Sequence, residues 1–306
     1  MTAETAPAIA VSRVAVSRRP RGLGLGRQLV LQVVCLLVGL TVIFPVLWIV
    51  AMAVDPRNLS RPDTLFPPGA SLDAFARVLA KPTENPVSFG QLALNSLFIA
   101  VFITVASVSI GVLAAYAFSR MRFRGREFLM IAILAVLMLP AVATLAPLFV
   151  SMNKIQIGGF NLRNSLIGVA IAIISSQLPF AVWNMKGYLD TIPRELEEAA
   201  VVDGAGRFRT FWSVILPLAT PVLAVTALFA FIAGWTEFIL SWAFLTDASS
   251  FTLAMALNGM VGQYASNTPW SSFAAFSILF AIPPMVAYAF LQRYIVSGLT
   301  IGGVKG

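Results

Sequence analysis

The chain has 306 residues, of which 58% are hydrophobic and only 11% are charged, and its mean hydropathy is +0.87. A soluble domain carries about 25% charged residues, so this composition excludes an ordinary soluble protein and indicates a membrane protein. The net charge of +8 comes from basic residues that flank apolar runs and form no separate basic domain, which argues against a nucleic-acid partner.

Six apolar stretches have the roughly 20 residues that a helix needs to cross a bilayer. They are continuous runs and not alternating ten-residue segments, so the sequence predicts an all-α integral membrane protein with six transmembrane helices. The first run is much longer than the core of a signal peptide, and we expect an uncleaved helix. The predicted spans are residues 28–54, 92–118, 128–150, 165–185, 218–245 and 272–291.

The distribution of lysine and arginine sets the predicted orientation. Residues 1–27, 119–127, 186–217 and 292–306 together hold 15 basic residues, whereas the three alternate connections hold six. Basic residues favour the cytoplasmic side, so we expect both termini in the cytoplasm. The single cysteine, Cys35, lies inside the first span and the chain has no histidine, so we expect simple packing of Cys35 and no metal site.

The first external connection, residues 55–91, is rich in proline and balanced in charge. Because prolines and turn residues interrupt regular structure, we expect an extended, ordered segment with little helix. Asn95 and Ser96 follow it at the start of the second predicted span. Either side chain is suited to cap that helix.

Prolines lie inside the third, fourth and sixth predicted spans: Pro140, Pro147, Pro179, Pro283 and Pro284. A proline within a helix removes a hydrogen bond and kinks the helix, and kinked helices would let a pathway open on alternate sides. Proline is also simply more frequent in membrane helices than in soluble ones, so both interpretations stay open.

Glu237 is the only carboxylate inside a predicted span. Charged side chains in a membrane are costly and usually face a cavity or a partner, so one interpretation is that Glu237 lines a pathway or contacts a second subunit. It also lies about 20 residues beyond Pro217, roughly 30 Å along a helix, which would place it in water at the outer interface. Both alternatives stay open.

The last external connection, residues 246–271, has no basic residue. Its first part, from Phe251 to Gln263, mixes apolar residues with amides, which predicts a short helix at the surface. The part from Gly262 to Trp270 predicts an irregular loop.

The connection 186–217 is far longer than a turn between two spans requires, and it mixes five acidic with four basic residues. Thr191 is suited to cap a helix with Pro193 in its first turn, and Gly204 is suited to end that helix in the left-handed conformation. A second short helix is expected from Arg207, ended by Pro217. Its expected apolar anchors are Phe208, Phe211 and Trp212. Such a helix–turn–helix suits insertion into a cleft of another protein.

An ordered motif runs through this connection. Glu198-Ala199-Ala200 is followed after three residues by Gly204, and after nine more by Val214-Ile215-Leu216-Pro217. The motif resembles the cytoplasmic loop of the membrane-spanning subunits of binding-protein-dependent ABC importers, which have isoleucine in place of Val214. The stretch from Ala115 to Phe123 and the ending from Gln292 to Gly306 are similar to the maltose-type permeases of that family.

The resemblance implies a fold and a set of partners. The fold would be the type I importer permease fold, with a transmembrane domain over residues 28–291 between cytoplasmic tails 1–27 and 292–306. The partners would be a second, different permease, a dimer of ATPase subunits and an extracytoplasmic sugar-binding protein in the inner membrane of a bacterium. The cargo would be maltose, maltodextrin or a related oligosaccharide.

The resemblance also implies site residues. Those in the ATPase cleft would be Glu198, Ala199, Ala200, Asp203, Gly204, Ala205, Leu216 and Pro217. Those of a tail that reaches toward the ATPase would be Gly302, Gly303, Val304, Lys305 and Gly306. Those that contact the binding protein would be Tyr264, Ala265, Ser266, Asn267, Thr268 and Pro269. Sugar contacts lie largely on the partner permease in this family, so the resemblance assigns no sugar ligand here.

The chain lacks a G-x-x-x-x-G-K-[ST] phosphate loop. We therefore expect no enzymatic activity and no bound cofactor, with ATP and magnesium used by the partner ATPase. One alternative is the same machine with another cargo, such as a polyol or a glycerol phosphate ester. Another is a secondary transporter or channel, but only Glu237 fits the ionisable groups that such proteins place at mid-membrane. A third is a membrane scaffold without transport activity.

Overall fold

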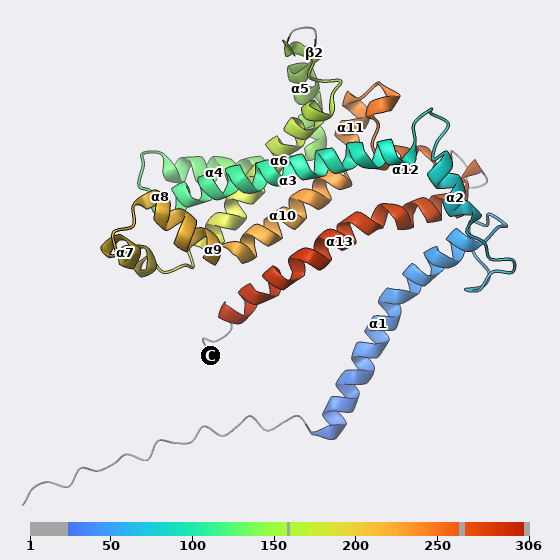
Figure 1. Ribbon diagram of the computed structural model, residues 1–306, viewed down its shortest axis with the longest axis horizontal. Coiled ribbons are helices and arrows are strands. Elements are labelled where there is room, and N and C mark those ends of the chain that lie inside the picture. The colour runs from blue at the N-terminus through green and yellow to red at the C-terminus, as the bar shows by residue number, and fades with distance from the viewer. Residues whose placement is uncertain (1–23, 158–159, 263–266, 303–306) are drawn as a thin grey trace, which may run out of the picture. The chain divides into compact units, whose positions relative to one another are not determined.

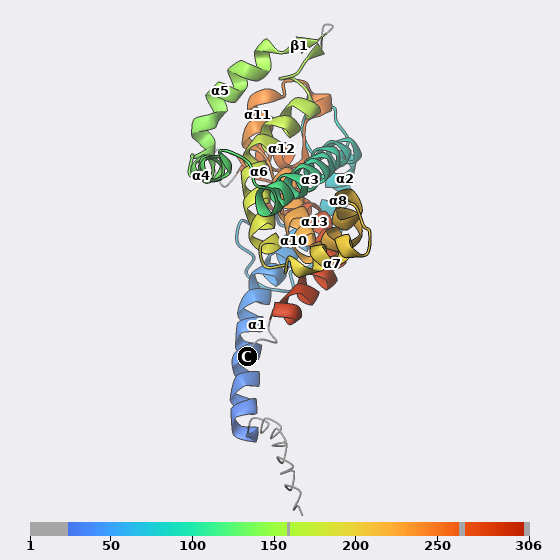
Figure 2. The same ribbon diagram turned by 90° about the vertical axis from the view of Figure 1, so that its left-hand side faces the viewer.

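The computed structural model describes residues 24–157, 160–262 and 267–302 (Figures 1 and 2). The chain divides into two compact units, residues 1–47 and residues 48–306. Helix α1 (Leu25–Val54) begins in the first unit. Its most apolar stretch has no buried side chain, as expected of a helix whose surroundings are lipid.

The second unit is almost entirely helical in the part that the structure describes. Its long helices are α3 (Phe89–Arg120), α6 (Leu166–Leu189), α10 (Thr220–Trp235) and α13 (Trp270–Gly302). The shorter elements are α2 (Asp73–Ala80), α4 (Arg126–Leu137), α5 (Ala141–Lys154), the antiparallel strands β1 (Gln156–Ile157) and β2 (Phe160–Asn161), α7 (Glu195–Val202), α8 (Arg207–Thr210), the π-helix η1 (Phe211–Ile215), α9 (Leu216–Leu218), α11 (Ile239–Phe244), the 3-10 helix η2 (Ala248–Ser250) and α12 (Leu253–Gly259).

Four helices in the described part of the chain are long and apolar enough to cross a membrane: α1, α3, α6 and residues 270–295 of α13. Two bent helix pairs raise this number to six if each pair forms one span. The prediction of an all-helical membrane protein is confirmed. The predicted count of six spans depends on the two bent pairs.

The third predicted span, residues 128–150, is not one straight helix. Helix α4 ends at Leu137, and the part of α5 from Val142 onward lies at 105° to it. Pro140 stands between them. A proline lacks the N–H that a continuing helix needs, and its ring pushes the preceding residue out of the helical conformation. The kink expected here is therefore a complete break.

The fifth predicted span, residues 218–245, begins at a bend. Residues 207–218 and α10 meet at 73°. Pro221 has no N–H to donate to the carbonyl of Pro217, and the Thr220 hydroxyl donates to that carbonyl instead, at 2.7 Å. The chain therefore bends at Ala219 while the Pro217 carbonyl keeps a hydrogen-bond partner.

The expectation that Pro217 ends the second loop helix is wrong. The helical path continues through Pro217 to Leu218 in α9. The wider π-helical turn η1, in which the Leu216 N–H donates to the Phe211 carbonyl, precedes this proline and makes room for it. The bend lies after Pro217 and before Pro221, between Leu218 and Thr220.

The helix that contains the last predicted span, residues 272–291, extends beyond it at both ends. Helix α13 begins at Trp270 and runs to Gly302, so the predicted tail continues the helix through that residue. Pro283 and Pro284 lie inside α13 without ending it. Of the predicted ATPase-facing tail, residues 303–306 lie outside the described part of the chain.

The external connection 55–91 holds more regular structure than expected, because it contains α2. Ala74 and Val78 are one helical turn apart and both are buried, and this spacing gives an amphipathic helix despite the nearby prolines. They pack in a cluster that also contains Leu92 of α3 and Phe276 of α13. The helix thereby attaches this connection to the long helices.

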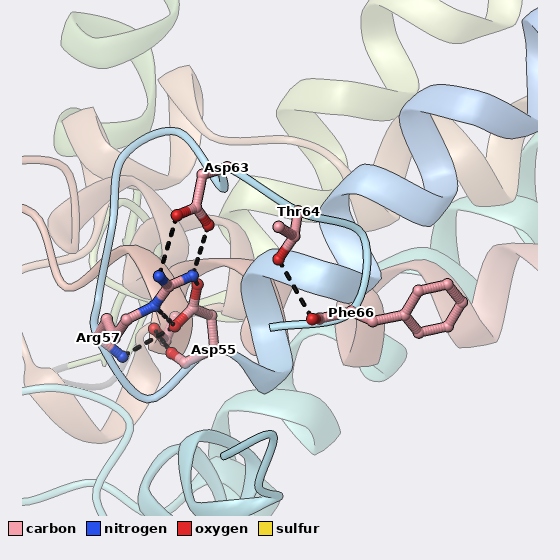
Figure 3. Close-up of polar contacts among 6 residues, drawn as sticks. Asp55, Arg57, Asp63, Thr64 and Phe66 are labelled. Carbon is pink, nitrogen blue, oxygen red and sulfur yellow. Dashed lines mark hydrogen bonds and ion pairs between the residues drawn. The ribbon is translucent and has the colours of Figure 1, made fainter. Parts of the chain in front are cut away.

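The start of the same connection is organised around Arg57 (Figure 3). Its guanidinium pairs with Asp55 at 2.8 Å and with Asp63 at 2.6 Å. The hydrogen bond from Arg57 holds the pKa of the Asp55 carboxyl below its ordinary value, although burial opposes this shift. The Ser271 hydroxyl in turn donates to the Asp55 carbonyl at 2.6 Å, which attaches this connection to the start of α13.

Neither Asn95 nor Ser96 caps α3, contrary to expectation. The helix begins at Phe89, and the side chain of Ser88 accepts the capping hydrogen bond from the Gln91 N–H at 3.2 Å. Asn95 and Ser96 lie inside the helix and are buried. Their polar groups therefore have partners elsewhere in the fold.

Helices α6 and α10 pack along α3 (Figure 1). The closest approach lies at Gly234 of α10, where an added Cβ would be 2.8 Å from the Cα of Ala100 and 2.9 Å from Cδ1 of Ile103. Helices in membranes associate through small residues that let backbones approach closely. Gly234 is therefore what allows α10 to lie against α3.

We expect Gly234→Ala to lower the melting temperature of the detergent-solubilised protein, because overpacking a close helix contact costs about 1–3 kcal/mol. Gly187→Ala in α6 is the matched control, since an added Cβ there meets no described heavy atom within 4 Å. That change should be neutral or slightly stabilising, because alanine favours helix by up to about 1 kcal/mol over glycine. Equal melting temperatures for the two variants would contradict the close packing.

Candidate functional site

The connection between α6 and α10 carries the sequence motif, and it folds into the two expected short helices (Figure 1). Gly204 has φ +83°, which confirms its predicted left-handed conformation. The Gly204 N–H donates to the Val201 carbonyl at 3.0 Å and the Ala205 N–H donates to the Ala200 carbonyl at 2.9 Å. These two bonds form a Schellman motif, which satisfies the last carbonyls of α7 and turns the chain sharply.

Thr191 does not cap α7, so that prediction is wrong. Its hydroxyl donates back to the Tyr188 carbonyl at 2.7 Å, because α6 continues to Leu189 and Thr191 still belongs to its final turn. Helix α7 begins at Glu195 without a side-chain cap. Its first turn carries three glutamates, whose charge is favourable beside the positive end of the helix dipole.

Three residues at the end of α3, Tyr116, Ser119 and Arg120, hold this loop and are called here the α3 clamp. Arg120 forms an ion pair with Glu197 of α7, and its guanidinium also donates to the Ile192 carbonyl at 2.8 Å. The Tyr116 hydroxyl donates to the same Glu197 carboxylate at 3.2 Å. The side chains of Arg120 and Glu197 are only 8% and 16% exposed, so water screens this pair weakly.

The Ser119 part of the clamp holds the start of the loop. Its hydroxyl donates to Asp190 at 2.6 Å, and Lys186 contacts the other oxygen of that carboxylate at 2.5 Å. Burial acts to raise the pKa of Asp190, but the hydrogen bonds from Lys186 and Ser119 outweigh it and hold this pKa below its ordinary value. The carboxylate is therefore charged at neutral pH. Arg194 also donates to the Ser119 carbonyl at 3.2 Å.

The apolar side of the loop packs on the long helices through η1 and α9. Phe211 and Ile215 are buried in a cluster with Val112 and Ala115 of α3 and Met185 of α6. The Phe211 ring also lies 4.9 Å from the ring of Tyr116.

The sequence prediction of three aromatic anchors is right for Phe211 only. Phe208 and Trp212 are exposed, with ring centroids 5.9 Å apart. The helical turn that buries Phe211 directs these two rings away from the cluster. They extend the exposed surface of the loop.

The predicted motif residues lie largely on the exposed side. Glu198, Ala199, Asp203, Gly204 and Pro217 are exposed, while Ala200, Ala205 and Leu216 are half-buried. Val202 and Phe208 add exposed apolar surface, at 86% and 78% exposure. One face of the loop is therefore held by α3. The other face is exposed and carries both apolar and acidic side chains, so it is accessible to a partner.

At the other end of α3, part of the predicted binding-protein contact is described. Thr268 is buried, and its hydroxyl accepts from the Gly262 N–H at 3.0 Å. Gly262, Asn267 and Pro269 line a pocket of about 700 Å³ together with Arg77 of α2 and residues of α12. Tyr264, Ala265 and Ser266 lie outside the described residues.

The expected helix in this connection is confirmed as α12, but it is not at the surface. Leu253 and Met255 are almost fully buried, and α12 packs on α3 and α13. The amides that suggested an exposed helix lie at and beyond its end. The connection is thus an integral part of the fold.

Glu237 lies in the break between α10 and α11. Its carboxylate accepts from the Leu240 N–H at 2.6 Å, and from the N–H and hydroxyl of Ser241 at 2.9 and 2.8 Å. It therefore satisfies the open N–H groups at the start of α11. Its expected role at a pathway or subunit interface stays a prediction, beside this local role that sequence reasoning missed.

Comparisons with known proteins agree with the arrangement of the helices. Residues 107–301 match the family model described as binding-protein-dependent transport system inner membrane component. The chain is 35% identical over 282 residues to the trehalose/maltose transport system permease protein of Thermococcus litoralis, which covers 92% of this chain and 98% of that protein. It is 39% identical over 218 residues to the maltodextrin transport system permease protein of Streptococcus pneumoniae, which covers 71% of this chain and 76% of that protein.

A solved structure is also similar. A chain of a bacterial ABC transporter involved in the import of the acidic polysaccharide alginate matches with a TM-score of 0.71 and 24% identity. The match covers 88% of this chain and 96% of that chain. It shows that the two chains share a fold.

We expect Glu197→Ala to loosen α7, because it removes the carboxylate partner of the Arg120 guanidinium. Losing one member of a fully buried pair costs several kcal/mol, and for this half-buried pair we expect about 1.4 kcal/mol, which corresponds to tenfold faster amide exchange. Hydrogen exchange of residues 195–202 measures this effect. Glu195→Ala, at an exposed position of the same turn, should leave exchange nearly unchanged, and equal exchange in both variants would contradict the role of the clamp.

Proposed function

The chain belongs to the family of binding-protein-dependent transport system inner membrane components, and we propose that it serves an importer of maltose, maltodextrin or a related oligosaccharide. As a member it is a multi-pass inner membrane permease subunit of an ABC importer and is not itself catalytic. The cargo is inferred from relatives whose names specify trehalose, maltose or maltodextrin. The names of these relatives do not support the alternative cargo, a polyol or a glycerol phosphate ester.

The observation that carries the proposal is the exposed face of the 186–217 loop. A partner ATPase would bind this face through Glu198, Ala199 and the apolar side chains of Val202 and Phe208. Small residues at the motif let a partner backbone approach closely, and the exposed aromatic rings supply apolar area of the kind that dominates interfaces. The ATPase, and not this chain, would use ATP and magnesium.

The α3 clamp would couple this docking face to the long helices. A loop that was free to move would yield when the ATPase closes on ATP. The half-buried pair of Arg120 and Glu197 would make α7 move together with α3. Closure of the ATPase would therefore shift the long helices and expose the pathway on alternate sides of the membrane.

The opposite end of the molecule would receive the extracytoplasmic binding protein. In the orientation that the basic residues predict, with both termini in the cytoplasm, the 246–271 connection faces outward. The pocket beside Asn267 and Pro269 offers a recess with Arg77 and Lys81 at its rim. A second structure of the alginate transporter is in complex with a periplasmic protein.

The exposed apolar helix faces of this chain would contact lipid and a second permease.

We expect Phe208→Ala to reduce co-purification of the ATPase by about tenfold, because truncating an aromatic residue at an interface centre often costs more than 1 kcal/mol. Phe66→Ala is the matched control, since Phe66 is also highly exposed but lies in the first external connection, directed away from the Arg57 contacts (Figure 3). The control should co-purify like the wild type. Equal loss in both variants, or no loss in either, would contradict docking at this loop.

The cargo is tested in the assembled importer, purified with its neighbours and reconstituted in vesicles. We expect uptake of radiolabelled maltodextrin that requires ATP and the cognate binding protein. Galacto-oligosaccharide and glycerol phosphate are the comparison cargoes. Uptake of galacto-oligosaccharide alone would narrow the cargo to a related oligosaccharide. Uptake of glycerol phosphate without uptake of either oligosaccharide would contradict the proposed substrate class while leaving the importer assignment intact.

A further inference from the structure

The end of α3 opposite the clamp carries a second set of polar contacts, made by Asn95 and Ser96, which are called here the latch pair. The Asn95 side-chain amide donates to the carbonyls of Ser249 and Phe251, both at 2.8 Å. The Ser96 hydroxyl accepts from the Leu253 N–H at 2.8 Å. Both contacts connect α3 to the 246–271 connection, more than 150 residues away in the chain.

The latch pair is buried and its hydrogen bonds are complete. Asn95 and Ser96 are 4% and 1% exposed. The Gln91 side chain donates to the Asn95 oxygen at 2.9 Å, which fixes the orientation of the amide. Removal of the Ser96 side chain would leave the buried Leu253 N–H without this partner, and removal of the Asn95 side chain would take the amide donor from the part-buried carbonyls of Ser249 and Phe251. An unmade hydrogen bond is costly away from water.

The backbone groups that bond to the latch pair lie at the start of α12 and in the turn before it. The Leu253 N–H is one of the first donors of α12, which has no intrahelical partner of its own. Ser249 and Phe251 flank the turn that leads into this helix. The latch pair therefore fixes the entry into α12 against α3, and α12 lines the pocket beside Gly262 and Asn267.

Helix α3 joins the latch pair to the clamp without interruption. It has 32 residues and no proline, and at 1.5 Å per residue it extends about 48 Å. Figure 1 shows α12 and α7 near its opposite ends. The close approach of Gly234 to Ala100 holds α10 against its outer half.

We infer that Asn95 and Ser96 are positioning residues through which engagement of the binding protein at the 246–271 connection is transmitted along α3 to the ATPase-facing loop. The inference rests on the proposed function, because it needs partners at both ends. A displacement of α12 moves the Ser249 and Phe251 carbonyls and the Leu253 N–H, and these pull on α3. The clamp then carries the displacement of α3 to Glu197 and α7.

The test uses the complete importer in lipid nanodiscs, with ATP hydrolysis measured against the concentration of sugar-loaded binding protein. We expect Ser96→Ala and Asn95→Leu to keep the basal hydrolysis rate. The maximal stimulation by the binding protein should fall about fivefold or more, within the ordinary range of coupling between sites. This loss should persist at saturating binding protein.

Ser107→Ala is the matched control. Ser107 lies on the same helix, is fully buried, and its hydroxyl has no hydrogen-bond partner among the described residues. Its stimulation should equal that of the wild type. Equal loss in Ser107→Ala and Ser96→Ala would overturn the inference, because packing of α3 would then explain both.

Other outcomes also decide the matter. Full stimulation of the latch variants at high binding-protein concentration would overturn the inference, since the pair would then only shape the docking surface. A wild-type importer without any stimulation would overturn the proposed function and the inference together. A stimulated wild type with unaffected variants would overturn the inference alone.

A second measurement covers variants that fail to assemble. Hydrogen exchange is followed in the wild-type importer with and without the binding protein. We expect protection to change at residues 249–253 and at residues 195–202 together, while the middle of α3 keeps its protection. A change confined to residues 249–253 would overturn the inference.

Discussion

The ion pair between Arg120 and Glu197 is the contact on which the arrangement of the 186–217 loop depends. Helix α7 has eight residues, none of which is buried in the described structure, and so short a helix is unstable by itself in water. Apolar burial through Ile192, Phe211 and Ile215 fixes the chain on either side of α7. Helix α7 itself is held by a half-buried charge pair and its hydrogen bonds, which fix orientation more strictly than apolar contact does.

The same constraint explains why α3 is central to the fold. Lipid is as apolar as a leucine side chain, so helices in a membrane gain little from apolar contact with one another. This chain uses a small-residue contact in the interior, at Gly234 and Ala100, and buried polar contacts toward both ends of α3. Polar contacts at these ends are specific, because each buried donor and acceptor must find its partner.

The breaks in the helices follow a related rule. Where a helix is interrupted, its open backbone groups need partners, and the chain supplies them locally. The Thr220 hydroxyl donates to the Pro217 carbonyl, to which Pro221 has no N–H to donate. The Glu237 carboxylate accepts from the N–H groups at the start of α11. Breaks whose backbone groups are satisfied in this way are tolerated within a membrane bundle.

Features that depend on neighbouring residues could be predicted from the sequence: the long apolar helices, the left-handed turn at Gly204, the helix from Arg207 and the motif of the loop. Hydropathy and turn chemistry are local, so the printed order of residues determines them. The partners of Asn95, Ser96, Tyr116 and Arg120 were decided by tertiary structure. A polar residue in an apolar run has many possible partners, and only the packing of segments 70 to 160 residues apart selects one.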